Sequence, residues 1–177
     1  HWTEEPKQFR PTTRMPQFFK LSNQQDHAAE RFNPIELAGM AEYLLGKSQP
    51  LELLSPKDGY QPNPERGKEL FGTKGCIACH THGEVAGIKA DFGPELSRVS
   101  AKLVGGKAGF DWLYTWIREP ERHHARTKMP NLFLTAEGEG DKFVDPAADI
   151  AAFLLQHKGA PSDFKPTADY DTIDVDD

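Results

Sequence analysis

The chain has 177 residues, of which 37% are hydrophobic and 27% are charged, and its net charge at pH 7 is -6. This length suits one well-buried domain with an extension, whereas two complete domains would be a tight fit. No window approaches the roughly 20 apolar residues of a membrane-spanning helix, and no basic stripe alternates with aromatic residues. We therefore expect no membrane-spanning segment and no nucleic-acid partner.

The two ends of the sequence carry signals of their own. The sequence begins at His1 without an initiator methionine or an apolar leader, which predicts a processed form or a piece of a longer protein. Residues 160–177 hold six acids and one lysine. We expect this acidic tail to be a solvated, flexible end, with a docking patch for a basic partner as the alternative.

The first helix signal in chain order covers residues 34–45. Asn33 is a candidate N-cap, Pro34 suits the first helical position, apolar residues follow at helical spacing, and Gly46 stops the pattern. Residues 49–62 contain three prolines and a glycine. This stretch is predicted to be a linker.

The second helix is expected at residues 64–74 and leads into the only two cysteines of the chain. Cys76 and Cys79, with His80 next, form a CxxCH motif, which is typical of covalent haem c attachment. Two thiols three positions apart lie on one side of a helical turn and can reach the two vinyl-derived carbons of a porphyrin. The adjoining His80 then faces the iron.

Two other uses of a CxxC pair have different sequence contexts. A thioredoxin-like redox pair needs a preceding strand, and a zinc site needs two further ligands at short spacing. Neither context is present around Cys76. Haem attachment is therefore the favoured interpretation.

The rest of the chain also reads as helical. Apolar residues at helical spacing predict helices at 94–102, 109–118 and 146–157. Alternation of apolar and polar residues over four to eight positions is hard to find, so strand signals are weak. We expect an all-α fold.

Residues 63–159 resemble a class I c-type cytochrome domain. The features that carry the resemblance are, in order, Gly67-Lys68-Glu69-Leu70-Phe71, the CxxCH motif, Gly93-Pro94-Glu95-Leu96, the aromatic helix around Trp112 and Trp116 followed by Pro120, Thr127-Lys128-Met129-Pro130, and a closing helix. The resemblance implies a helical domain around one covalent haem c. It also implies single-electron transfer with a redox donor and acceptor, and a periplasmic or equivalent location on the outer side of an energy-transducing membrane.

By the same resemblance Met129 is the sixth iron ligand, opposite His80. Thioether ligation favours reduced iron and raises the potential. A lone methionine is more often a core filler, but Pro130 stiffens this loop. His82 is too close to His80 to reach the opposite haem face, and the other competing donors, His123 and His124, lie in a polar stretch typical of a surface loop.

The resemblance assigns supporting roles to four further residues. Pro94 would accept the Nδ1 proton of His80 and fix its tautomer. Tyr114 and Trp116 would lie near the haem edge and propionates, with plain core packing as the alternative. Thr127 would hydrogen-bond near the methionine sulfur or a propionate, with a local cap as the alternative.

The first 48 residues repeat the second half of this pattern. The closing-helix signal at Asn33-Pro34 parallels the one at Asp145-Pro146. Residues 1–48 are therefore predicted to be the C-terminal half of a second cytochrome c domain whose CxxCH half is missing, with Met15 as a ligand of a second haem. The matching pairs are Trp2 and Trp116, Pro6 and Pro120, Thr13 and Thr127, Arg14 and Lys128, Met15 and Met129, and Pro16 and Pro130.

Such a half-domain cannot bury its own apolar face. We expect the chain to be a piece of a longer multihaem protein with an upstream CxxCH. The alternatives are that residues 1–48 pack on the complete domain, or that another haem-bearing chain covers them. The predicted function is outer-sphere electron transfer within a multihaem or membrane-associated complex, and the alternative is a haem domain of an enzyme such as a peroxidase or oxidase.

Overall fold

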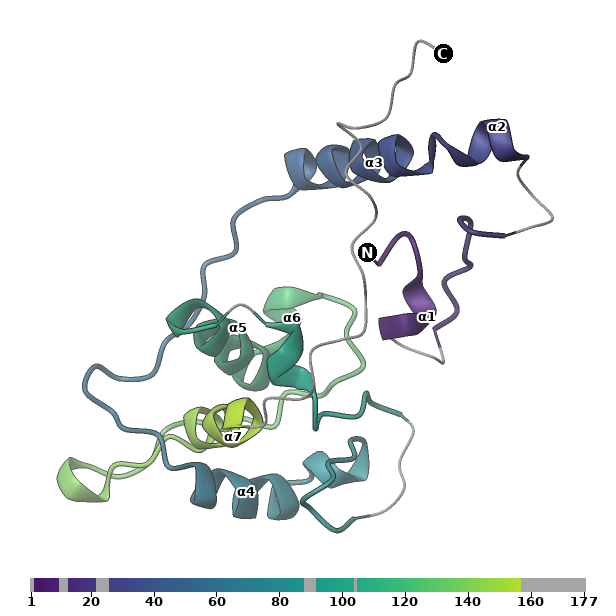
Figure 1. The fold of residues 1–177 in the computed structure, drawn as a ribbon. Helices are drawn as coiled ribbons and strands as arrows, with labels where there is room; N and C mark the ends of the chain where they lie inside the picture. The colour runs from purple at the N-terminus through teal and green to yellow at the C-terminus, as the bar shows by residue number, and fades with distance from the viewer. Residues whose placement is uncertain (1, 10–12, 22–25, 88–91, 104, 157–177) are drawn as a thin grey trace. The chain divides into compact units, whose positions relative to one another are not determined.

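The computed structural model describes residues 2–9, 13–21, 26–87, 92–103 and 105–156 (Figure 1). Within these ranges the regular elements are helices, and β-pairing is limited to two isolated bridges, His82 with Val85 and Glu137 with Val144. The expected all-α fold is confirmed. No helix of the described ranges has the length and apolarity needed to cross a membrane. The expected acidic tail, residues 160–177, lies outside the described residues.

The chain divides into two compact units. Unit 1 holds the described residues of His1–Pro50, and unit 2 holds those of Leu51–Ser162. Unit 1 contains α1 (Pro6–Phe9), α2 (His27–Glu30) and α3 (Asn33–Lys47). The helix expected at 34–45 is thus present, but Asn33 is its first residue rather than its cap, because Phe32 occupies the N-cap position and offers no side-chain hydrogen bond.

The described residues of unit 2 form four α-helices and three short 3-10 turns. The helices are α4 (Pro64–Thr73), α5 (Lys107–Arg118), α6 (Pro120–His123) and α7 (Pro146–Gln156). The 3-10 turns are η1 (Cys76–Ala78), η2 (Val99–Lys102) and η3 (Gly140–Lys142). The capping signal before α4 works as expected, since the side chain of Asn63 accepts a hydrogen bond from the backbone N–H of Arg66 at 3.0 Å.

The prediction of a helix at 94–102 is wrong for most of these residues, because only the 3-10 turn η2 forms there. The physical reason is that residues 94–97 make their hydrogen bonds with another segment. The backbone N–H of Leu96 donates to the carbonyl of Thr81 at 3.0 Å, and the hydroxyl of Ser97 accepts from the N–H of Gly83 at 2.7 Å. These hydrogen bonds hold residues 94–97, which form no helix, against the residues that follow the CxxCH motif.

The core of unit 2 is centred on the packing of α4 against α7, which lie side by side in Figure 1. Gly67 allows the two backbones to touch, because a Cβ at this position would overlap the carbonyl group of Asp149. One turn later Phe71 meets Phe153, with ring centroids 5.9 Å apart. Helix α5 completes the core with buried Leu113, Tyr114 and Ile117.

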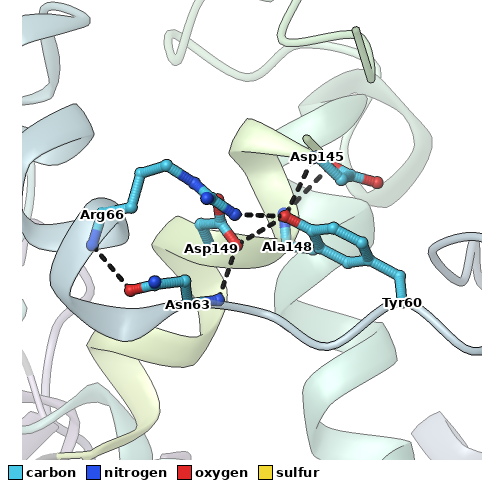
Figure 2. A network of polar contacts seen from close by, with 6 residues as sticks. All are labelled: Tyr60, Asn63, Arg66, Asp145, Ala148 and Asp149. Atoms are coloured by element: carbon cyan, nitrogen blue, oxygen red, sulfur yellow. Dashed lines mark hydrogen bonds and ion pairs between the residues drawn. The ribbon is translucent and has the colours of Figure 1, made fainter. Parts of the chain in front are cut away.

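A network of polar contacts also joins α4 to α7, near the start of α4 (Figure 2). The carboxylate of Asp149 is fully buried and accepts hydrogen bonds from the Tyr60 hydroxyl at 2.8 Å, the Asn63 N–H at 2.7 Å and the Arg66 Nε at 2.5 Å. Nη2 of Arg66 also donates to the Tyr60 oxygen at 2.7 Å. Both oxygens of the buried carboxylate thus accept hydrogen bonds and one of them is paired with Arg66, which is the condition under which a buried carboxylate is tolerated.

The stretch before α4, residues 51–62, packs against the helices of unit 2, the unit to which it belongs. The backbone N–H of Leu54 donates to the hydroxyl of Thr115 at 2.8 Å, and the hydroxyl of Ser55 donates to the carboxylate of Asp111 at 2.9 Å. Leu54 and Tyr60 lie against the hydrophobic core. Residues 51–62, most of the expected linker, therefore contribute to holding the site-bearing unit together.

Candidate functional site

The CxxCH segment leaves α4 through a glycine turn. Gly75 has φ of +94°, a conformation that costs glycine little, and it redirects the chain into η1. The turn brings the two sulfur-bearing residues and the histidine together, since the N–H groups of Cys79 and His80 both donate to the carbonyl of Cys76, at 3.2 and 2.8 Å. Both cysteines are free and partly buried.

Burial is the main cause that raises the pKa of the Cys76 thiol to about 11. Cys76 is therefore a neutral thiol at neutral pH. A thiol is the form that adds across a vinyl group to make a thioether. Cys76 thus has the protonation state that addition to a vinyl group requires.

His80 is oriented by the segment that follows the motif. Its Nδ1 lies 2.8 Å from the carbonyl oxygen of Pro94. A carbonyl only accepts, so Nδ1 carries the proton and donates it, and Nε2 keeps the lone pair that an iron ion needs. Gly93 is required at this point, because a Cβ there would lie 2.6 Å from the His80 ring.

Met129 is held by two hydrogen bonds from different parts of unit 2. Its backbone N–H donates to the hydroxyl of Thr127 at 3.2 Å, so Thr127 acts as a local turn former. Its sulfur accepts a hydrogen bond from the indole Nε1 of Trp116 at 3.1 Å. Trp116 comes from α5, so this contact ties the methionine loop to the helical core.

Two tryptophans and a histidine form a stacked aromatic group beside this loop. Trp112 and Trp116 stack with centroids 5.5 Å apart and an angle of 16° between their planes. The ring of His123 lies 4.7 Å from Trp112 and 4.8 Å from Trp116. Burial lowers the pKa of His123, so its imidazole is neutral at neutral pH. No spacing rule in the sequence links His123 to the two tryptophans, and their contact becomes visible only in the folded chain.

His82 and His124, which the sequence did not predict as iron ligands, make other contacts. His82 is buried, its ring centroid lies 4.6 Å from that of Phe153, and its Nδ1 accepts from the N–H of Glu84 at 3.2 Å. Nδ1 of His124 accepts from the N–H of Arg126 at 3.0 Å. Each ring thus has a local structural role.

Tyr114 is buried in the hydrophobic core of unit 2. Its hydroxyl donates to the buried carboxylate of Asp145 at 2.8 Å, at the start of α7. Burial and this neighbouring negative charge raise the pKa of Tyr114 well above its ordinary value. The position is one of core packing, and the expected role of Tyr114 near the haem edge stays a prediction.

Residues 64–158 match the family model described as Cytochrome c, which is more than half of the chain. The chain belongs to the cytochrome c family. This cytochrome carries haem c, bound covalently with its iron, and its role is electron transfer. Among solved structures, the crystal structure of SoxXA from P. pantotrophus is similar over 60% of this chain and 89% of the matched chain, with 20% identity and a TM-score of 0.46. No curated protein sequence matches the chain.

The residues present fit the family's cofactor. The free thiols of Cys76 and Cys79 share one short turn, and His80 offers one unprotonated ring nitrogen. Met129 offers a polarisable sulfur from a loop held at both its backbone and its side chain. Imidazole nitrogen and thioether sulfur are both donors that the iron of a c-type haem accepts.

Proposed function

We propose that this cytochrome transfers single electrons through a haem c attached at Cys76 and Cys79 and ligated axially by His80 and Met129. The observation that carries the proposal is the pair of pre-oriented donors, one imidazole nitrogen and one thioether sulfur. The bound group supplies a one-electron Fe(III)/Fe(II) couple. The protein residues hold the ligands, set the potential and limit access to the iron.

Each ligand has a partner that tunes it. The carbonyl of Pro94 accepts the Nδ1 proton of His80, which fixes the tautomer and makes Nε2 a stronger donor. The indole of Trp116 donates to the Met129 sulfur and so withdraws electron density from it. A less electron-rich thioether favours the reduced state, so this contact acts to raise the potential.

An enzyme of the peroxidase or oxidase type needs an open sixth position, and this is the second candidate function. The contacts around Met129 favour the electron carrier instead. The loop is held by a backbone bond to Thr127 and a side-chain bond to Trp116, and Pro130 restricts it further. Both axial positions would be filled in each oxidation state, so no substrate would meet the iron.

The cellular setting belongs to the same proposal. We place the protein in the periplasm or its equivalent, with a redox donor and acceptor that bind through small, short-lived interfaces. Its proposed organisation is a half-domain at 1–48, a connecting stretch at 49–62, a complete domain at 63–159 and an acidic tail at 160–177. It would act within a multihaem or membrane-associated electron-transfer complex.

The test is the visible spectrum of the oxidised protein. A methionine sulfur on ferric haem gives a weak charge-transfer band at the red end of the spectrum. Substitution Met129→Ala is expected to remove the contribution of this site, while Met129→His restores a six-coordinate haem without the band. Met40→Ala is the matched control, because Met40 lies within α3 of unit 1, away from any Thr-x-Met-Pro loop. A band unchanged by both Met129 variants would refute the axial assignment.

A further inference from the structure

We propose that the described residues 2–47 form the methionine half of a second haem c site, with Met15 as the axial ligand. The inference rests on the proposed role of Met129, because the two methionine loops are compared with each other. The occupant is a haem c carried by a CxxCH-bearing helical segment like residues 64–80. The argument uses three observations within unit 1.

The first observation is that the sequence repeat is also a repeat of local structure. In unit 1 a four-residue helix begins at a proline after Trp2, as α1 at Pro6–Phe9. In unit 2 a four-residue helix begins at the equivalent proline, as α6 at Pro120–His123. In both units the helix thus begins at the paired proline.

The two methionines also share the same turn. The N–H of Met15 donates to the hydroxyl of Thr13 at 3.2 Å, and the N–H of Met129 donates to the hydroxyl of Thr127 at 3.2 Å. Each methionine is followed by proline and preceded, thirteen positions earlier, by a tryptophan. In unit 2 that tryptophan is the hydrogen-bond donor to the methionine sulfur. Unit 1 thus contains the parts of the Met129 arrangement in the same order.

The second observation is that unit 1 has an apolar face with no cover among its described residues. In α7 eight residues are buried, and much of that burial comes from α4. In α3, a longer helix, only Asn33 and Leu37 are buried. Leu44 and Leu45, which continue the apolar stripe of α3 from Leu37 at helical spacing, are instead 57% and 68% exposed. Such a face needs a partner to be stable in water.

The third observation identifies what is missing. The chain has two cysteines, and both belong to the CxxCH motif of unit 2. The one histidine among the described residues of unit 1, His27, is fully exposed and lies 3.4 Å from the carboxylate of Glu30. The described residues of unit 1 therefore offer a thioether ligand and an apolar cover, but neither the thiols nor a buried imidazole to lie opposite. The complementary half supplies those groups.

The order of the halves in unit 2 fixes the source. There Cys76 precedes Met129, and α4 packs against the later helix α7. The same order in unit 1 places the CxxCH half on the N-terminal side of these residues in the same polypeptide. The protein would then be a linear relay in which each haem is enclosed by consecutive segments.

The experiment uses the full-length gene product, made in a host that attaches haem c. Haem content per polypeptide is measured by pyridine haemochrome against intact mass, and the red charge-transfer band is measured per polypeptide. We expect at least two haems. Met15→Ala and Met129→Ala should each lower the absorbance of the band per polypeptide by the same amount, and Met40→Ala should leave it unchanged. Met15→His should lose the same increment while retaining haem content, which separates ligation from misfolding.

The outcomes separate this inference from the proposed function. A band that decreases in Met129→Ala but not in Met15→Ala or Met15→His would overturn the second site and leave the first intact. A band unaffected by Met129→Ala would instead overturn the proposed function. One haem per polypeptide, with a Met15-dependent increment seen only when a second chain co-purifies, would refute the assigned source. Two haems and two equal increments support the inference.

Discussion

The contact between α4 and α7 yields a prediction that compares two glycines of one helix. Gly67 and Gly72 both lie in α4, so replacement by alanine gains the same helix propensity, about 0.5–1 kcal/mol. Their surroundings differ. A Cβ at Gly67 would overlap the Asp149 carbonyl and lie 3.0 Å from the backbone N of Ile150, whereas a Cβ at Gly72 would lie 3.6 Å from a methyl group of Val85.

The two substitutions should therefore have opposite signs. The overlap at Gly67 is with backbone, which cannot rotate away, so the helices must separate at an overpacking cost of about 3 kcal/mol. Subtracting the propensity gain leaves Gly67→Ala less stable by about 2 kcal/mol, or roughly 10 °C in Tm for a domain of this size. At Gly72 the new methyl meets an ordinary van der Waals contact. We expect Gly72→Ala to be about 0.5 kcal/mol more stable.

The assay is guanidinium denaturation of the holoprotein, followed by far-ultraviolet circular dichroism and by the haem absorption band. Both probes should give the same midpoint if unit 2 unfolds as one cooperative body. The reasoning would be refuted if Gly67→Ala were as stable as Gly72→Ala. Close backbone contact between α4 and α7 would then not be the reason for glycine at position 67.

Three further predictions concern the polar contacts. Trp116→Phe removes the hydrogen-bond donor to Met129, the proposed axial ligand, and should lower the potential in voltammetry. A net hydrogen-bond contribution of about 1 kcal/mol sets an upper limit of roughly 40 mV on this shift, because only the part that differs between the two oxidation states counts, and an unchanged potential would exclude the tuning role. Asp149→Asn should destabilise unit 2 by about 3 kcal/mol in denaturant titrations, because it leaves Arg66 without its buried carboxylate, whereas Glu84→Gln at the exposed pair with Lys68 should cost less than about 1 kcal/mol. The folded state raises the pKa of Tyr114 above 10, so its proton is kept where the unfolded chain releases it. The free energy of unfolding should therefore fall above about pH 10, by about 1.4 kcal/mol per pH unit for this group, and Tyr114→Phe should remove that share of the slope.

Local signals in the sequence predicted the helices of unit 2 with useful accuracy. Asn63 and Pro64 mark the start of α4, and apolar spacing locates α5 and α7 within two residues at their starts. Capping and periodicity act within one helix, so they can be recognised without the fold. The CxxCH motif likewise needs no tertiary information.

The errors and omissions have tertiary causes. Pro94 was expected to begin a helix, but its carbonyl accepts from His80 and its neighbours bond to residues 81–83. Asp149 sits in an apolar run, and only the packing of α4 reveals that it binds Arg66. The bond between Trp116 and Met129 joins residues thirteen positions apart, through a loop whose course no local pattern defines.

The buried carboxylate of Asp149 also sets an order of events during biosynthesis. It joins residues 83 to 89 positions earlier in the chain, so the start of α4 is anchored only after α7 has been made. A chain that emerges from its N-terminus presents Cys76, Cys79 and His80 long before that. The long sequence separation makes this contact a late and slow one. The thiols are therefore accessible on a chain in which α4 and α7 have not yet closed, which is the form that covalent attachment of the haem can use.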